Sequence, residues 1–213
     1  MSNTLTHVQA LVTTYPALAQ ARGAIEEAAR ALIAGFRAGG KLLVCGNGGS
    51  CADSDHIVGE LAKGFLKKRP LPERTRQAIR SALPEEGDAL AGALQGGLPA
   101  ISLAAHASLL TAFANDVRAD YAFAQAVVAY GRRGDMLVGI STSGNARNVA
   151  CAVAVARAVG MTTIGLTGAT GGRLRELADI AICVPATATP RIQELHLPVY
   201  HALCAEVEEA LFA

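Results

Sequence analysis

The sequence contains no tryptophan, and aromatic residues make up only 4% of its 213 residues. Aromatic platforms for stacking nucleobases are therefore not expected. Positive and negative charges nearly cancel, at 19 Lys and Arg against 18 Asp and Glu, so the net charge gives no support for non-specific binding of nucleic acid. No uncharged apolar run is long enough to span a bilayer, and the N-terminal residues lack the basic and apolar regions of a signal peptide.

The five cysteines are an odd number, are scattered along the chain, and form no Cys-x-x-Cys pair. This pattern excludes a disulfide framework and a zinc ribbon, and it indicates reduced thiols in a cytoplasmic protein. Because 51% of the residues are hydrophobic, the chain is long enough to bury a sizeable core. We therefore expect a single domain over residues 1–213.

Five short apolar runs alternate with helical segments along the chain. The runs lie near residues 42–45, 99–103, 135–140, 162–166 and 180–184. Each connection is long enough for a right-handed crossover between parallel strands. The pattern predicts an α/β fold with a five-stranded parallel sheet in a three-layer α/β/α sandwich.

Two segments stand outside this alternation. Residues 1–40 predict two helices separated at Pro16, which either cover one face of the sheet or form an oligomer interface. Residues 71–97 are polar, helix-prone and punctuated by proline and glycine, which predicts an insert of two short helices, as a lid or an oligomer edge. Just before the insert, Lys67, Lys68 and Arg69 predict a solvated basic helix end, which could also attract a phosphorylated substrate.

The first strand leads into a loop of small residues, Gly46-Asn47-Gly48-Gly49-Ser50, and then a helix. In a parallel α/β fold such a loop lies at the carboxyl end of a strand, where glycines let a ligand approach and helix N–H groups attract anions. It is not a dinucleotide fingerprint, because Cys51 occupies the place of the third glycine, and it is not a P-loop. The two interpretations are an anion-binding loop and a tight structural turn.

A second loop of small polar residues, Ser141-Thr142-Ser143-Gly144-Asn145, follows the third strand. Its hydroxyl and N–H groups suit the oxygens of a phosphate monoester, and it contains no lysine. The alternative is capping of the next helix by Ser143 or Asn145. Two such loops after two parallel strands favour a shared sugar-phosphate crevice.

Residues able to bind a metal ion lie on two predicted helices. His56 and Glu60 are four residues apart, so both leave one face of the first helix after a strand. Gln193 and His201 lie on the last helix, where Pro198 predicts a kink. Two imidazoles, a carboxylate and an amide suit a divalent metal, zinc first, although a lone helical histidine is more often structural.

Four motifs, in order and spacing, resemble the sugar isomerase (SIS) domain family: CGNGGS followed by HIVGE, then GISTSGN, GLTGATGG and RIQELHLPVYH. Within that family they look like the phosphoheptose isomerases. The resemblance covers residues 28–212 apart from the insert. It implies an isomerase that converts sedoheptulose 7-phosphate to D-glycero-D-manno-heptose 7-phosphate, or acts on a related phosphosugar. The resemblance also implies a homotetramer with zinc in active sites at subunit interfaces, and no nucleic-acid or membrane partner is expected.

The resemblance also assigns roles to residues by position. Glu60 and His201 match the catalytic pair, and the implied metal ligands are His56, Glu60, Gln193 and His201. The implied substrate-binding residues are Asn47, Gly48, Gly49, Ser50, Ser141, Thr142, Ser143, Asn145, His106 and Gln193. Through these residues the resemblance predicts aldose–ketose isomerisation by way of a cis-enediol.

The chain departs from the family pattern in the residues expected around the sugar. Ala146 replaces an expected serine, His106 falls on an expected aspartate, and Thr187 and Ala188 fall where some members carry acidic residues. The competing hypothesis is a non-catalytic SIS protein that senses phosphosugars or associates with a replication initiator. The joint presence of His56, Glu60 and His201 favours the enzyme.

Overall fold

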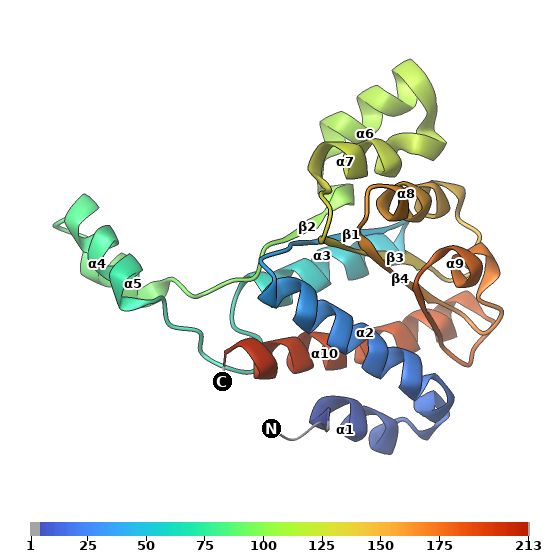
Figure 1. Cartoon of the computed structure of the whole chain (residues 1–213), viewed down its shortest axis with the longest axis horizontal. Coiled ribbons are helices and arrows are strands. Elements are labelled where there is room, and N and C mark those ends of the chain that lie inside the picture. The colour runs from blue at the N-terminus through green and yellow to red at the C-terminus, as the bar shows by residue number, and fades with distance from the viewer. Residues whose placement is uncertain (1–4, 213) are drawn as a thin grey trace.

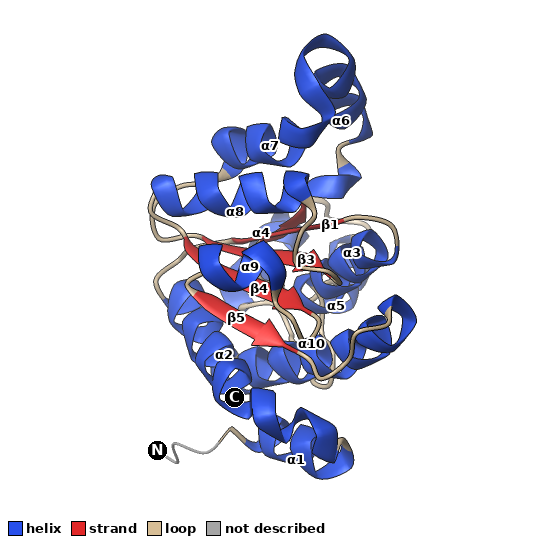
Figure 2. Ribbon diagram, turned by 90° about the vertical axis from the view of Figure 1, so that its right-hand side faces the viewer, coloured by secondary structure: helices blue, strands red, loops and turns tan. Residues whose placement is uncertain are grey.

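The computed structural model describes residues 5–212. Its centre is one sheet of five parallel strands in the order β2-β1-β3-β4-β5. The strands are β1 (Leu42–Gly46), β2 (Ala100–Ser102), β3 (Met136–Ser141), β4 (Thr162–Thr167) and β5 (Ile180–Cys183). Figures 1 and 2 show the sheet with helices on both faces, so the predicted three-layer α/β fold is confirmed.

The strand residues divide between two buried cores. Leu42 and Val44 of β1 face one core, and Leu43 and Cys45 face the other, as alternation along a strand requires. The first core is covered by α1 (Thr6–Thr14), the 3-10 helix η1 (Pro16–Ala21), α2 (Arg22–Arg37), α3 (Gly49–Ala62) and α10 (Thr189–Leu211). The second is covered by α7 (Ala122–Tyr130), α8 (Arg147–Ala158) and α9 (Gly172–Leu177). Both faces of the sheet are buried, which explains the nearly continuous apolar strands.

The predicted insert consists of two helices, α4 (Glu73–Ala82) and α5 (Gly87–Ala93), that project from the sheet layers as a pair (Figure 1). Their base is closed by an antiparallel bridge between Pro70 and Gln95 and by the hydrogen bond from the Gly96 N–H to the Arg69 carbonyl, at 2.6 Å. Short helical pieces also connect β2 to α7. They are η2 (Leu103–Ala105), α6 (Ala107–Phe113), the π-helix η3 (Ala114–Arg118) and η4 (Ala119–Tyr121).

One boundary differs from the prediction, since the helix after β1 ends at Ala62 instead of continuing to Phe65. The last helix, α10, is one long helix with Pro198 inside it, as predicted. Residues 1–4, part of the predicted N-terminal extension, and residue 213 lie outside the described residues. Across residues 5–212, every helix is too short or too polar to cross a lipid bilayer.

Candidate active site

A cleft of about 370 Å³ lies at the carboxyl ends of β1 and β3. These strands are parallel neighbours, with Gly46 paired to Ile140, so the loops that follow them meet at one edge of the sheet. The first turn of α10 completes the wall through Thr189 and Gln193. The cleft thus brings together most of the predicted substrate residues, namely Asn47, Gly48, Gly49, Ser50, Ser141, Thr142, Ser143 and Gln193.

Two predicted substrate residues lie outside this lining. His106 stacks on Tyr130 with ring centroids 5.0 Å apart, and its Nε2 is buried without a hydrogen-bond partner. The Asn145 side-chain oxygen accepts a hydrogen bond from the Arg173 N–H, at 3.1 Å. The structure therefore places His106 against α7, and Asn145 joins the second loop to the start of α9.

The second loop presents two hydroxyl groups that each already accept one backbone hydrogen bond. Ser141 Oγ accepts from the Ala146 N–H at 3.3 Å, and Ser143 Oγ accepts from the Asn145 N–H at 3.1 Å. Each hydroxyl proton is then left to donate to an anion in the cleft. Gly144 fixes the loop at φ 69°, where an added Cβ would lie 1.9 Å from the Gly171 carbonyl oxygen. The loop is thus shaped as a preformed donor array.

We predict that Ser143→Ala weakens the binding of inorganic phosphate at least tenfold. A hydrogen bond to a charged group contributes roughly 1.5–3 kcal/mol, and about 1.4 kcal/mol corresponds to a factor of ten. Isothermal titration calorimetry measures the dissociation constant, with Ser81→Ala on the exposed surface of α4 as the matched control. An unchanged dissociation constant in Ser143→Ala would place the phosphate elsewhere.

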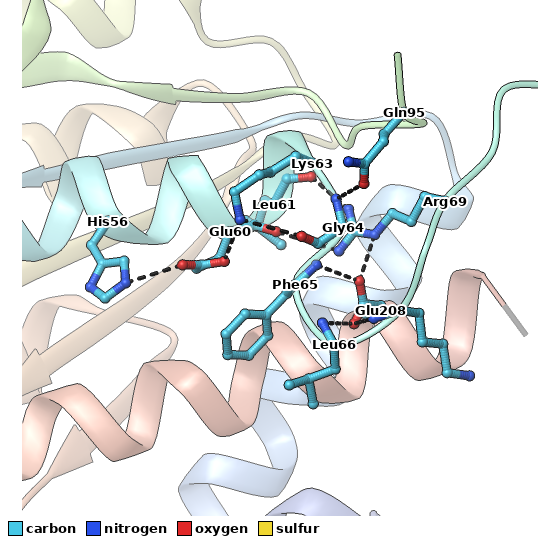
Figure 3. Close-up of polar contacts among 11 residues, drawn as sticks. His56, Glu60, Leu61, Lys63, Gly64, Phe65, Leu66, Arg69, Gln95 and Glu208 are labelled. Carbon is cyan, nitrogen blue, oxygen red and sulfur yellow. Dashed lines mark hydrogen bonds and ion pairs between the residues drawn. The ribbon is translucent and has the colours of Figure 1, made fainter. Parts of the chain in front are cut away.

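A cluster of titratable side chains lies between α3 and α10, beyond the cleft. His56 Nε2 is 3.2 Å from Glu60 Oε1, and the ring centroids of His56 and His201 are 5.0 Å apart. Lys63 donates to the other Glu60 oxygen at 3.1 Å. Figure 3 shows His56 and Glu60 side by side on α3. The structure thus brings together His56, Glu60 and His201, which are separated by up to 145 residues in sequence.

His201 lies in a half-buried position within this cluster. Burial lowers the pKa of its imidazole, nearby His56 lowers that pKa further, and Glu60 partly opposes both effects. Its Nε2 is buried without a hydrogen-bond partner. A neutral imidazole with an unsatisfied nitrogen is suited to accept or pass on a proton, or to bind a cation.

The residues proposed to hold a metal only partly converge. The side chains of His56, Glu60 and His201 supply nitrogen and oxygen donors that suit a divalent ion, and the unpaired His201 Nε2 fits that role. Gln193 instead lies in the cleft against Gly49, eight residues or about 12 Å along α10 from His201. Within residues 5–212, no group of three or more His, Cys, Asp or Glu side chains is arranged so that it could hold a metal ion.

A buried ion pair holds the end of α3 that carries Glu60 (Figure 3). Arg69 Nε donates to Glu208 Oε1 at 2.7 Å, with side-chain exposures of 0% and 1%. The guanidinium also donates to the carbonyls of Leu61, at 2.8 Å, and Glu60, at 3.4 Å. Glu208 in turn accepts from three successive N–H groups, those of residues 65–67, at 2.7–3.0 Å. The prediction that Arg69 belongs to a solvated basic end was therefore wrong, because Arg69 caps the carbonyls of α3 from inside the protein.

Comparison with known proteins identifies the class to which this fold and site belong. Two family models described as SIS domain match the chain, one over residues 97–204 and the other over residues 7–83. Residues 84–96 between them fall within the insert. The chain is therefore a SIS-domain protein.

The more specific family follows from individual relatives. A phosphoheptose isomerase of Rhodospirillum rubrum is 44% identical, over 88% of this chain and 86% of its own length. That of Burkholderia pseudomallei is 37% identical over 100% of this chain and 94% of its own. The solved phosphoheptose isomerase of Francisella tularensis superposes with a TM-score of 0.72 at 31% identity, covering 96% of this chain and 93% of that one. The chain belongs to the phosphoheptose isomerase family, as its motifs predicted.

Several residues of the site were not predicted from the sequence. Tyr200 contacts His56 and donates to Asp53, and Arg69, paired with Glu208, holds the Glu60 carbonyl. Asp53 carried a signal, since it precedes His56 by three residues and so shares its helix face. Glu208 likewise follows His201 by seven residues, or two helical turns. These spacings identify residues of the site only once the structure shows that α3 packs against α10.

Proposed function

We propose that the protein converts sedoheptulose 7-phosphate to D-glycero-D-manno-heptose 7-phosphate through a cis-enediol. The observation that carries this proposal is the arrangement along α3. Its first turn borders the hydroxyl-rich cleft at Ser50, and His56 and Glu60 lie about 9 and 15 Å further along the helix axis from Ser50. A sugar phosphate that reacts at C1 and C2 but carries its phosphate at C7 needs the two groups of donors to be this far apart.

Glu60 and His201 divide the proton transfers. Glu60 removes a proton from C1 of the ketose while His201, which enters this step as the imidazolium, supplies a proton to the C2 oxygen, which gives the enediol. Glu60 then returns a proton to C2, and His201 removes the proton from the C1 oxygen, which gives the aldose. The two residues come from different helices, so each can address a different atom of the substrate. Lys63 holds the second Glu60 oxygen, at 3.1 Å, and so orients the carboxylate.

The proposed cofactor is one zinc ion in each active site. His56, Glu60 and His201 would hold it, and Gln193 would join them only after a change of side-chain conformation. A bound zinc ion would polarise the sugar carbonyl and so acidify the adjacent C–H bond.

The proposed assembly is a homotetramer with active sites at subunit interfaces, each subunit being one SIS domain with an insert at residues 71–97. Exposed apolar side chains around His201 support an interface there, since Tyr15 is 41%, Leu66 61% and Leu197 41% exposed. Tyr15 and Leu66 line, with His201, a second cavity of about 260 Å³. The five free cysteines suit a reducing compartment, and we place the protein in the cytoplasm.

The rival function is a non-catalytic protein that binds phosphosugars or associates with a replication initiator. Such a protein needs only the hydroxyl-rich cleft. The His56–Glu60 contact and the nearby unpaired His201 nitrogen have no role in phosphate binding, so they favour the enzyme.

The test of the proposed function is a panel of five-, six- and seven-carbon ketose and aldose phosphates, assayed by NMR with the purified protein and measured metal content. We expect turnover of sedoheptulose 7-phosphate above all other members of the panel. Turnover of a pentose or hexose phosphate alone would contradict the heptose assignment while keeping the isomerase. Absence of turnover across the panel with zinc supplied would contradict the enzyme.

A further inference from the structure

The side of His56 that faces away from Glu60 lies in a hydrogen-bonded chain. His56 Nδ1 is 2.9 Å from the Tyr200 hydroxyl oxygen, and that hydroxyl donates to Asp53 Oδ1 at 3.3 Å. The Tyr200 side chain is only 2% exposed, and its ring meets the imidazole edge-on with centroids 5.4 Å apart. Asp53 and His56 come from α3 and Tyr200 from α10, so the chain of contacts bridges the two helices of the site.

The number of protons in this chain decides which nitrogen of His56 is protonated. The phenol of Tyr200 has one proton, and it uses that proton in the hydrogen bond that it donates to the Asp53 carboxylate. The oxygen of Tyr200 then offers only a lone pair to His56, so Nδ1 must carry the imidazole proton and donate it. In a neutral imidazole this leaves Nε2 bare.

The unprotonated Nε2 of His56 faces a carboxylate oxygen of Glu60, which is also a hydrogen-bond acceptor. Nε2 lies 3.2 Å from Glu60 Oε1, and a lone pair facing a carboxylate oxygen is stable only with a cation between or beside them. In the metal-free protein that cation is the Lys63 ammonium, 3.1 Å from the other Glu60 oxygen. Both His56 nitrogens thus have fixed neighbours, since Nδ1 lies beside the Tyr200 hydroxyl and Nε2 faces Glu60.

We propose that Asp53 and Tyr200 are positioning residues that hold His56 in its Nδ1–H tautomer, with Nε2 turned toward Glu60 as a metal ligand. This inference rests on the proposed function for its purpose, but it concerns a state of the metal-free protein. Fixed outer partners of this kind orient a ligating histidine, and their loss commonly weakens metal binding or activity 10- to 100-fold.

The direct test is the tautomer of His56 in metal-free protein with 15N-labelled histidine, read by long-range 1H–15N NMR. The His56 signals are assigned by their loss in His56→Gln. In the wild type we expect a protonated Nδ1 and an unprotonated Nε2. A neutral ring with its proton on Nε2, or a ring protonated on both nitrogens at pH 8, would overturn the proposal.

Two substitutions at Asp53 distinguish an effect of the Tyr200–Asp53 hydrogen bond from an effect of side-chain packing. Asp53→Ala removes the acceptor, so Tyr200 is free to donate to Nδ1 and the proton of His56 should move to Nε2. Asp53→Asn keeps a side-chain oxygen that accepts from Tyr200, so it should retain the wild-type tautomer. The same tautomer in Asp53→Ala as in the wild type would contradict the proposed role.

Tyr200→Phe tests the middle of the chain with nearly unchanged shape. We expect mixed tautomers in the metal-free protein, zinc binding weakened 10- to 100-fold in a chelator competition, and a lower kcat at unchanged KM. The matched control is Tyr130→Phe, which alters the ring stacked on His106 and should change none of these. If Tyr200→Phe does not fold, the Asp53 pair still decides the question.

The outcomes also distinguish this inference from the proposed function. A tautomer shift in Asp53→Ala, in a protein that turns over no sugar phosphate, would support the positioning role and contradict only the enzyme. Normal wild-type turnover with an unchanged tautomer in both Asp53→Ala and Tyr200→Phe would contradict the positioning role alone.

Discussion

Glu60→Gln is expected to lower kcat about 1000-fold while leaving the fold intact. A positioned acid or base contributes roughly 10²- to 10⁴-fold, and an amide of the same shape cannot take a proton from carbon. The carbonyl of residue 60 is held by Arg69 at 3.4 Å whichever side chain is present, so the helix end should not move. The assay is turnover of sedoheptulose 7-phosphate together with the thermal midpoint and zinc content.

Two controls make this result interpretable. Glu27→Gln makes the same chemical change at an exposed position of α2, remote from the cluster, and should retain full activity. The zinc content separates the two duties assigned to Glu60, because a variant that keeps zinc but loses turnover has lost the base. Retention of more than a tenth of the wild-type kcat would show that another group takes the proton.

The second large effect is expected at the buried ion pair. Arg69→Met should lower the free energy of unfolding by about 3–5 kcal/mol, because it leaves the Glu208 charge buried without its partner. In a chain of this length, that corresponds to a fall in Tm of about 6–20 °C. Activity should fall as well, since Arg69 also holds the carbonyls of Glu60 and Leu61. Calorimetry and the isomerase assay measure the two effects.

Replacing both partners should not restore stability. In many proteins a buried ion pair can be exchanged for apolar residues at little cost. Here Glu208 also accepts from the N–H groups of residues 65–67, and an apolar residue would leave these three donors unsatisfied. We therefore expect Arg69→Met combined with Glu208→Leu to be at least as unstable as Arg69→Met alone, with Arg80→Met at the exposed pairs of the insert as a near-neutral control. A double variant as stable as the wild type would refute this account of the turn.

The same contacts predict how acid acts on the protein. Burial alone would raise the pKa of Glu208, but the N–H groups of Phe65 and Leu66 and the Arg69 guanidinium outweigh burial and lower it. Because the folded-state pKa lies below the ordinary value of 4.5, the stabilisation is complete above that pH and is lost as pH falls toward the folded-state pKa.

The strands and the cleft could be predicted from the sequence because both depend on local patterns. Apolar runs followed by small-residue loops mark the strands, and parallel strands necessarily bring their carboxyl ends to one edge. This is why Asn47 and Ser143, 96 residues apart, were expected in one crevice, and they line one.

The support of the site could not be predicted, because it depends on how α3 and α10 pack. The helix after β1 ends at Ala62, where the chain turns so that three N–H groups reach Glu208, more than 140 residues later. No local sequence pattern predicts that turn. The basic residues 67–69 indicated a solvent-exposed helix end instead. Tyr200 was overlooked because an aromatic residue beside His201 is equally typical of a helix core.

The central claim is that this site moves protons between carbon and solvent through an enediol. The most direct measurement is conversion of sedoheptulose 7-phosphate by the wild-type protein in D₂O, followed by NMR and mass spectrometry. The account predicts an aldose 7-phosphate that carries solvent deuterium at C2, with deuterium appearing at C1 of the remaining ketose as the reaction reverses. Product without deuterium, or no product from zinc-supplied protein, would contradict it.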